Sequence, residues 1–595
     1  MLYRIILMIW HNTFFSIYRV WVPNQKECIQ PAEGGGMEIP MEIAIAVSIL
    51  ILLILLKMWY DGKNYQKKLH ARLLREWGIP DASEYTPEKM ENIAGFYDAH
   101  TGENDVDDIT WNDLDMDLIY QQINHTQSAM GQEYLYYLLR KPQLGEEKLA
   151  QRETLITFFM DEEEKRLKLQ KKLDVIGKTG KFSVYNYLIR VRSLKKENRI
   201  RHILQMLALL VSVGLCFVWP SQFVLIAVAV AVYNMVTYYQ RKAEMERYYQ
   251  LFSYIVKMVH FSKDVAALDI PELEPYFAKL RQSAEKFDSF CRGSSLVVGG
   301  NNMQGDLLDT LMDYVRLLTH IDIIKFQSMA VEAIRLEDDL ITLYQVIGFL
   351  DSMISIASYR IMMKEYCVPN LGQVERQLMI KELYHPLILE PVKNTIEAHK
   401  SVLLTGSNAS GKSTFIKTVA VNAILAQTIH TVLAQEYTAD FFRIYSSMAL
   451  RDNIMNQESY YIVEIKSLKR IVDEAEKGEA PVLCFIDEVL RGTNTVERIA
   501  SSTQILSLLD ASGALCFAAT HDIELTRLLQ EQYDNYHFEE KVEGKNVIFD
   551  YRLRKGKAMT RNAIKLLDMM GYPEDMITKA QKCVSCFLET GEWKL

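Results

Sequence analysis

Eight consecutive residues, Gly406 to Ser413, read GSNASGKS and match the pattern G-x-x-x-x-G-K-S without a gap. In this pattern the glycines let backbone N–H groups surround phosphate oxygens, and the lysine reaches the outer phosphates of ATP. The serine hydroxyl is suited to hold Mg²⁺. The predicted ATP-binding residues are Gly406, Ser407, Asn408, Ala409, Ser410, Gly411, Lys412, Ser413 and Thr414.

Two later segments end in groups suited to phosphate chemistry. The apolar run VLCFI is followed by Asp487 and Glu488. Asp487 suits Mg²⁺, and Glu488 suits the base that polarises an attacking water. The apolar run ALCFAAT is followed by His521, which we expect to contact the γ-phosphate. The alternative is an acidic pair that only caps the next helix, beside a histidine without a role. We predict that Glu488 and His521 are catalytic and that Ser413 and Asp487 hold Mg²⁺.

These groups need a scaffold that brings distant segments to one edge. Beyond about residue 380, short β-rich runs such as HKSVLLTG alternate with helix-like stretches. This alternation predicts a parallel sheet with helices on its faces. Before it, apolar residues recur at three- and four-residue steps from Leu114, which predicts helices. We therefore expect an all-α domain over residues 109–380, an α/β domain over 381–580 and a C-terminal tail over 581–595.

Two further motifs resemble one family. The segment QESYYIVE, residues 457–464, looks like the MutS signature STFMVE, and RGTNT, residues 491–495, resembles the MutS sequence RGTST. MutS proteins have ABC-type ATPase domains with their motifs in this order. The resemblance implies that Ser459 completes the ATP site of a second subunit, so that a homodimer encloses two nucleotides through its ATPase domains. Departures such as Ser407 and Tyr460–Tyr461 lie beside the reacting groups and leave those groups in place.

The resemblance covers roughly residues 109–578 and is weaker in the helical part. Mismatch-reading members carry an N-terminal domain with a Phe-x-Glu wedge, and no such motif occurs in a comparable position here. The stretch between the core helices also looks too short for a full DNA clamp. Mismatch reading therefore cannot be carried over residue by residue.

A charge-free window between His202 and Arg241 predicts a membrane hairpin over residues 203–239, with a turn at Pro220. A bilayer core of about 30 Å takes about 20 helical residues, so the window fits two short spans. A buried helical hairpin in a soluble core is the rival interpretation. The apolar character runs all round each helix and both flanks are basic, which favours the membrane.

A third apolar run, Ile43 to Leu56, predicts a transmembrane helix over residues 37–60 and a cytosolic linker over 61–108. Basic residues follow this run, so its C-terminal side is expected in the cytoplasm. The chain then crosses the membrane outwards and back again through the hairpin, so both ends of the hairpin lie in the cytoplasm. The expected protein is a multi-pass protein of the cell membrane with a cytoplasmic ATPase domain. Residues 1–36 fit no signal peptide, and we expect translation to start at Met37.

Bulk composition excludes several classes of protein. Hydrophobic residues make up 49% and charged residues 24%, so long disorder is not expected. The net charge of −9 argues against a strongly basic nucleic-acid binder. Residues 164–202 nevertheless hold thirteen Lys and Arg against three Asp and Glu. These charges suit either DNA phosphates or the membrane-adjacent position, and we favour the membrane. Cys583 and Cys586 lack a second ligand pair, so we place them on one helix face rather than in a metal site.

The sequence thus predicts an α/β P-loop (ABC-type) ATPase domain after an all-α MutS-like core, with about three transmembrane helices. We expect a membrane-anchored ATPase that uses ATP and Mg²⁺ as a homodimer and is related to DNA processing or mismatch repair. One alternative is an ATP-switched membrane scaffold with a protein or lipid ligand. An ABC-type transporter is less favoured, because the spans lack the intramembrane charges that mark a substrate route.

Overall fold

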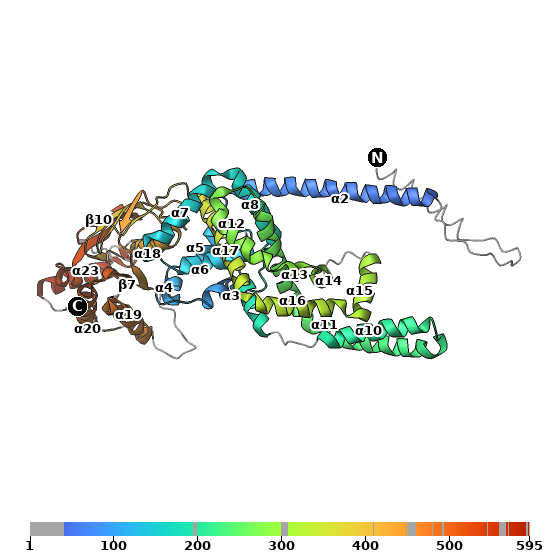
Figure 1. Ribbon diagram of the computed structural model, residues 1–595. Helices are drawn as coiled ribbons and strands as arrows, with labels where there is room; N and C mark the ends of the chain where they lie inside the picture. The colour runs from blue at the N-terminus through green and yellow to red at the C-terminus, as the bar shows by residue number, and fades with distance from the viewer. Residues whose placement is uncertain are drawn as a thin grey trace. The chain divides into compact units, whose positions relative to one another are not determined.

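The structure is a computed structural model that describes residues 41–595 apart from 82, 194–198, 299–306, 408–409, 449–459, 479, 491–492, 544–545, 558–563, 565–566, 569, 591–592 and 594–595. The described residues are mostly helical and include two mixed sheets. The chain divides into two compact units, residues 1–69 and 70–595 (Figure 1). The predicted upstream segment, residues 1–36, lies outside the described residues.

The first unit is described from residue 41 and contains the beginning of α2 (Met41–Glu76). The predicted span Ile43–Leu56 lies within this helix of 36 residues, which continues into the predicted linker as far as Glu76. Trp59 and Tyr60 follow the apolar run and are 60% and 64% exposed. The ammonium of Lys63 lies 4.1 Å from the Trp59 ring centroid. Aromatic rings and a lysine in this order are typical of a membrane–water interface.

The second unit begins with a helical region that packs around one apolar core. Its helices are α3 (Pro87–Asp98), α4 (Asp108–Asp113), α5 (Met116–Ile123), α6 (Ala129–Arg140), α7 (Glu146–Asp161), α8 (Glu163–Ile176), α9 (Val184–Arg190), α10 (Arg199–Cys216), α11 (Pro220–Val265), α12 (Glu274–Glu285), α13 (Asp288–Cys291), α14 (Ser295–Val298), α15 (Leu307–Thr319), α16 (Ile321–Arg335) and α17 (Glu337–Met363). Short 3₁₀ turns are η1 (Val191–Ser193) and η2 (Pro271–Leu273). The predicted all-helical stretch from residue 109 to the 360s therefore matches the secondary structure.

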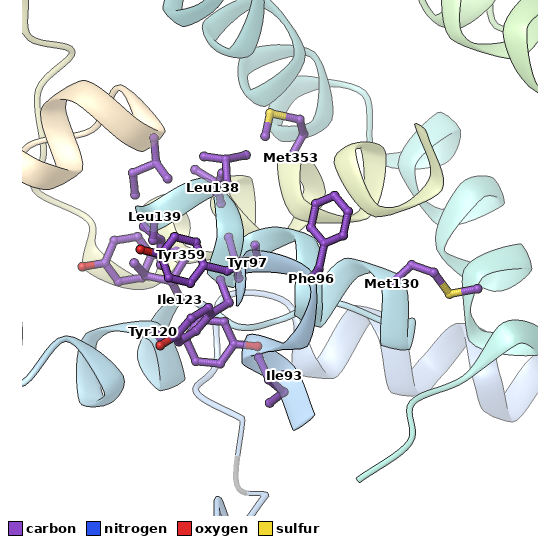
Figure 2. Packing of buried hydrophobic residues seen from close by; sticks show 14 of the residues in the cluster. Ile93, Phe96, Tyr97, Tyr120, Ile123, Met130, Leu138, Leu139, Met353 and Tyr359 are labelled. Atoms are coloured by element: carbon purple, nitrogen blue, oxygen red, sulfur yellow. The ribbon is translucent and has the colours of Figure 1, made fainter. Parts of the chain in front are cut away.

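The centre of this core lies between α3, α5, α6 and α17. Figure 2 shows side chains from these helices packed together, among them Phe96, Tyr120 and Met353. Full burial of an apolar side chain of this kind contributes about 1.5–3 kcal/mol. The α6 and α17 backbones approach closely because Gly131 and Gly348 lie at their contact. A Cβ at Gly348 would lie 2.7 Å from the Cβ of Tyr134, so a larger residue would force the helices apart.

The helices α10 and α11 form the predicted hairpin, and they turn around Trp219 and Pro220. Large apolar side chains point away from the pair, including Phe217 at 87% and Leu225 at 76% exposure. The polar side chains face inward instead. The Gln205 amide donates to the Thr237 hydroxyl across the two helices at 3.3 Å. A helix pair that is apolar outside and polar inside is the reverse of a soluble hairpin and is suited to lipid.

Three helices of the described residues are long and apolar enough to cross a membrane, namely Arg199–Cys216, Pro220–Lys242 and Glu337–Met363. The first two windows are only 22% and 17% buried, and they coincide with the predicted hairpin 203–239. The third is α17, whose window is 72% buried in the helical core. Composition alone therefore does not distinguish these three helices, whereas their burial within the protein does.

Six strands form the larger sheet, in the order β10-β9-β4-β8-β7-β6. These strands are β4 (Ser401–Thr405), β6 (Arg443–Ser447), β7 (Val482–Asp487), β8 (Leu515–Ala519), β9 (Tyr533–Glu543) and β10 (Asn546–Lys555). All neighbours run parallel except β9 and β10. The connecting and flanking helices are α18 (Lys412–Ile429), α19 (Tyr460–Lys477), α20 (Thr495–Ala511), α21 (Leu525–Leu528) and α23 (Glu574–Thr590). The predicted parallel sheet is therefore present, with an antiparallel strand added at one edge.

Alternate residues of the central strands face different helices. Val402 and Phe485 pack in the cluster that contains α18, whereas Leu403 and Cys484 pack in the cluster that contains α19 and α20. Successive side chains of a strand point to opposite faces. The helices therefore cover both faces of this sheet, and its parallel strands β4, β6, β7 and β8 are buried almost throughout, as expected for parallel strands.

A second, four-stranded sheet with the order β1-β5-β2-β3 was not expected from the sequence. It contains β1 (Asn370–Leu371), β2 (Leu378–Leu383), β3 (Asn394–Ala398) and β5 (Glu436–Ala439). The predicted domain boundary near residue 380 falls inside β2, while the last core helix ends at Met363. The predicted boundary at residue 580 similarly falls inside α23, which carries both Cys583 and Cys586 on one helix.

Candidate functional site

Three adjacent parallel strands bring the predicted chemical groups to one edge of the large sheet. Leu404 of β4 pairs with Ala519 of β8, and Ala519 pairs with Asp487 of β7. The glycine-rich loop follows β4, Glu488 follows β7, and His521 lies two residues after β8. Because parallel strands end at the same edge, segments separated by more than a hundred residues in sequence meet there.

The loop between β4 and α18 has the backbone that its glycines permit. Gly406 and Gly411 have φ of +145° and +106°, which side-chain-bearing residues rarely adopt. A Cβ at Gly406 would lie 2.9 Å from the Phe538 carbonyl oxygen, so the loop could not keep this approach with a larger residue. Gly411 is the N-cap of α18, and the N-terminus of a helix favours anions.

Lys412 is folded back onto its own loop. Its ammonium donates to the carbonyl oxygens of Gly406 and Ser407, at 2.8 Å each. The residue is only 5% exposed, and burial lowers the pKa of Lys412 although Asp487, Glu488 and Glu540 oppose that effect. Backbone carbonyl oxygens thus hold the charged ammonium beside the N-terminus of α18, where the helix dipole favours phosphate.

Two serine hydroxyls of the loop have surroundings that the motif does not reveal. The Ser407 hydroxyl donates to the carboxylate of Glu540, which is buried on β9. The Ser410 hydroxyl is buried and has no hydrogen-bond partner among the described residues. Glu540 was missed in the sequence because it lies more than a hundred residues from the loop in a strand with no motif. A buried hydroxyl without a partner costs free energy, so Ser410 is available to a ligand oxygen.

The predicted catalytic pair is in contact. His521 Nε2 lies 2.7 Å from Glu488 Oε1, and Glu488 has the left-handed φ of +61°. Non-glycine residues with this φ are uncommon and cluster at functional sites. The Glu488 N–H donates to the Ala519 carbonyl oxygen at 3.0 Å, so β8 fixes the turn that presents the carboxylate.

A bidentate ion pair holds the loop that contains His521. Arg498 of α20 donates to both carboxylate oxygens of Asp522, with Nε–Oδ2 at 2.9 Å and Nη2–Oδ1 at 2.6 Å. The hydrogen bonds and charge of Asp522 raise the pKa of Arg498. Parallel N–H bonds of this kind fix orientation as well as distance. Sequence motifs did not point to this pair.

The residues predicted to hold Mg²⁺ offer hard oxygen donors. The Ser413 hydroxyl is exposed in the first turn of α18, and the Asp487 carboxylate stands at the end of β7. Within the described part of the chain, no group of three or more His, Cys, Asp or Glu side chains could hold a metal alone. One hydroxyl and one carboxylate fit Mg²⁺, which typically shares its coordination with substrate phosphates and water.

A cavity of about 330 Å³ opens beside the loop. It is lined by Gly411, Thr414 and Phe415 on one side and by Tyr551 with the segment 383–394 on the other. Burial lowers the pKa of His385, which also lines the cavity, to about 4, so this ring is neutral at pH 7. No sequence pattern indicates this cavity, because most of its lining comes from a loop without a motif.

Several predicted residues cannot be placed. Asn408, Ala409 and Ser459 lie outside the described residues, as do Arg491 and Gly492. The elements on either side of residues 449–459 are described, and both contact the helical core. Asp113 of α4 accepts from the Ser446 hydroxyl at 2.7 Å and from the Met448 N–H at 2.9 Å. Arg470 of α19 pairs with Asp107, the N-cap of α4.

Part of the basic segment 164–202 is paired with carboxylates of the protein itself. Among the described residues of this segment, carboxylates contact Lys165, Arg166, Lys172, Lys178 and Arg192. The guanidinium of Arg166 is also buried against the Trp77 ring, 3.6 Å from its centroid. This pairing reduces the positive charge that the segment offers to DNA phosphates.

Comparisons with known proteins agree with this site. The family described as MutS domain V matches residues 402–587, which contain the loop and both predicted catalytic residues. The DNA mismatch repair protein MutS of Thermus aquaticus is 31% identical over 221 residues, 36% of this chain and 26% of that protein. The protein of the same name from Thermotoga maritima is 31% identical over 265 residues, 43% of this chain and 33% of that protein.

The chain therefore spans about a quarter to a third of the length of these curated relatives. The matched domain, the placement of its motifs at one sheet edge and the identity to several MutS proteins agree with one another. On this evidence residues 402–587 resemble MutS domain V, and the chain is similar to MutS proteins over 36–43% of its length.

Proposed function

We propose that the protein is a membrane-anchored ATPase that binds and hydrolyses ATP in a composite site shared by two subunits. One observation carries the catalytic part of this proposal: the glycine-rich loop that leads to Lys412, and the residues Glu488 and His521, follow three adjacent parallel strands, with Glu488 and His521 2.7 Å apart. A phosphate cradle beside a paired carboxylate and imidazole is suited to the attack of water on a terminal phosphate.

The loop can bind phosphate by exchanging its own contacts. Phosphate oxygens would replace the two carbonyl oxygens that now hold the Lys412 ammonium, while the N-terminus of α18 adds a favourable dipole. The Ser410 hydroxyl would gain the partner that it lacks. Ser413 and Asp487 would hold Mg²⁺, which neutralises phosphate charge. The base would occupy the adjoining cavity between Phe415 and Tyr551, whose walls are partly aromatic.

In this mechanism Glu488 polarises the attacking water, and His521 holds Glu488 and contacts the γ-phosphate. Arg498 orients the His521 loop through Asp522. The second subunit supplies Ser459, by resemblance to the family signature. A homodimer through the ATPase domains therefore closes only when ATP occupies the loop, and hydrolysis reopens it.

The membrane part of the proposal rests on the exposed apolar surface of α10 and α11. Their spanning windows are 22% and 17% buried, whereas α17 has the same mean hydropathy as α11 and is 72% buried. Exposed apolar area of this extent is costly in water. We propose that the hairpin and the first part of α2 lie in the cell membrane, with the ATPase domain in the cytoplasm.

The ligand that the ATPase serves is proposed from the relatives. Those proteins are named for DNA mismatch repair, which favours DNA as the partner. The internal pairing of the basic segment and the membrane hairpin favour the second candidate, an ATP-switched scaffold for a protein or lipid.

The test is phosphate release from Mg²⁺-ATP by the full chain in lipid nanodiscs, alone and with perfect, mismatched or branched duplex DNA. Lys412→Ala should remove nucleotide binding and turnover, whereas Lys417→Ala, one turn further along α18, should retain both. Stimulation by DNA that weakens with salt supports the DNA function. ATP turnover that no DNA changes supports the scaffold. Full turnover in Lys412→Ala would contradict the proposed ATP site.

A further inference from the structure

We propose that the helical core contains a second ligand site, separate from the glycine-rich loop, for a small nucleotide that carries phosphate beside an aromatic base. The site is a cavity of about 370 Å³ where α6, α7, α12 and α17 meet. These helices lie together in Figure 1. A cavity of this size is within the range of small-molecule sites.

The lining of this cavity is cationic and contains no carboxylate among its described residues. Four cations contribute: Lys141, Lys148, Arg152 and Lys279. Lys141 is paired with Asp105 at 2.8 Å, outside the lining. The other three have no carboxylate partner among the described residues, in a protein whose net charge is −9. Positive charge gathered in a concave site of an acidic protein indicates an anionic ligand.

Arg152 is the strongest sign of a missing anion. It is only 8% exposed, and burial lowers the pKa of Arg152 to about 10. Its guanidinium donates to the Thr428 carbonyl oxygen, and this is its only partner among the described residues. Arg360, at the neighbouring contact of α7 and α17, has the carboxylate of Glu153 instead. A buried cation without a counterion is costly, and an anion in the cavity would remove that cost.

Capping of α18 is the simpler role for Arg152, because Thr428 lies in the last turn of that helix. A cation there interacts favourably with the helix dipole. Capping accounts for one hydrogen bond of the Arg152 guanidinium, which has five N–H donors in all. It also leaves the unpaired Lys148 and Lys279 on the same cavity unexplained.

The remaining lining distinguishes a nucleotide from bare phosphate. Tyr134, Tyr276 and Phe349 line the cavity, and the Tyr276 and Phe349 rings lie 5.6 Å apart at 31°. Aromatic faces of this kind stack with a planar base. The side-chain amides of Gln143 and Gln151 supply donors and acceptors for the polar edge of a base.

One helix, α18, connects this cavity to the glycine-rich loop. Arg152 contacts the last turn of α18, and Lys412 begins the same helix. A ligand on Arg152 would therefore act on the far end of the helix that carries the phosphate-binding lysine. This effect on ATP turnover rests on the proposed function, whereas ligand binding at the cavity does not.

The binding test uses the full chain carrying Lys412→Ala in lipid nanodiscs, so that the loop does not contribute. Titration calorimetry measures the affinities for AMP, GMP, CMP and UMP. Inorganic phosphate and adenosine, which each carry only one part of a nucleotide, are measured for comparison. At least one monophosphate should bind ten-fold or more tightly than either partial ligand. The double variant Lys148→Gln with Lys279→Gln should bind that monophosphate ten-fold or more weakly. Addition of Arg152→Gln should weaken the binding further. Lys168→Gln, an exposed lysine on α8, should have no effect.

Equal binding of phosphate and monophosphates, or the same affinity in the two-lysine variant, would overturn the proposal. If only a 5′-phosphorylated oligonucleotide binds, the proposal of a small nucleotide is wrong, and the ligand is the end of a nucleic acid. If Lys412→Ala leaves ATP binding intact, the proposed ATP site fails while the cavity result stands. Lys148→Gln with Lys279→Gln in the otherwise native chain should keep basal ATP turnover and lose its response to the monophosphate.

Discussion

The guanidinium of Arg360 lies against the carboxylate of Glu153 in a two-bond arrangement, with Nη1–Oε1 at 2.7 Å and Nη2–Oε2 at 2.6 Å. The same guanidinium donates to the Thr431 hydroxyl and the His430 carbonyl oxygen, just beyond the end of α18. One buried arginine thus joins α7 and α17 of the helical core to the helix that begins at the glycine-rich loop.

Glu153→Gln should lower stability at pH 7 by about 3 kcal/mol, because a shift of one pKa unit corresponds to about 1.4 kcal/mol. Burial opposes ionisation, but hydrogen bonds from Arg360 and His430 outweigh it and lower the pKa of Glu153 from 4.5 to about 2. The folded-state pKa is depressed, so the contribution is complete above about pH 4.5 and is lost as the pH falls towards 2. Urea midpoints at pH 7 and pH 3 measure this. Glu146→Gln, exposed on the same helix, should match the parent, and an equal loss in both variants would contradict the assignment.

Glu488→Gln should bind ATP normally and hydrolyse it about 10²-fold more slowly or worse, because the water loses its base. Nucleotide binding and single-turnover phosphate release separate the two effects. Glu497→Gln, on α20 and away from His521, is the matched control. Near-normal turnover in Glu488→Gln would remove that residue from its proposed role.

Arg498→Met and Asp522→Asn should each lower kcat about ten-fold and leave KM for ATP nearly unchanged. The reason is positional, since the pair orients the loop that holds His521 against Glu488. The pH profile of kcat should change with it, which a loss of stability alone would not cause. Arg527→Met, exposed on α21, should behave as the parent. A rise in KM with constant kcat would instead assign the pair to substrate binding.

Ser459→Arg should permit ATP binding in one chain and block closure of the dimer. Mixing it with Lys412→Ala should restore one composite site per mixed dimer, formed by the intact loop of the first chain and the intact Ser459 of the second. Assays of each variant and of the mixture decide. If Ser459 only caps a helix, its loss costs about 1 kcal/mol of stability, and Ser459→Arg alone would turn over ATP.

Removal of residues 203–239, together with a start after Tyr60, should release the protein from the membrane fraction. The expected reason is the exposed apolar surface of α10 and α11. Fractionation with carbonate washing, followed by detergent extraction, measures this. Full-length protein that stays soluble and monodisperse without detergent would show that both helices belong to a soluble core.

The candidate chemical groups can be identified from the sequence, whereas the residues that support them cannot. Lys412 and Asp487 lie in short motifs that need only local strand and loop geometry, and the parallel pairing of their strands agrees with the prediction. Glu540, Arg498 and the cavity beside Phe415 depend on distant segments that meet only after folding. No local pattern marks such contacts, because burial and pairing are properties of the folded chain.

Element boundaries were also harder to predict than element types. The apolar run of α2 and its basic continuation have different compositions but form one helix. The domain boundary near residue 380 falls inside β2 because the four-stranded sheet recruits residues from both sides of α18. Hydropathy alone equally could not separate the buried α17 from the exposed α10.

The 46 residues of α11 form one uninterrupted helix that starts in the apolar hairpin and ends in the helical core. At about 1.5 Å per residue its axis is about 69 Å long. A straight helix of that length is a lever: each degree of tilt at the core end displaces the hairpin end by about 1.2 Å. If the hairpin is fixed in a bilayer, a displacement of the hairpin end tilts α11 at its core end. A change in membrane thickness or curvature would then exert a force on the helical core.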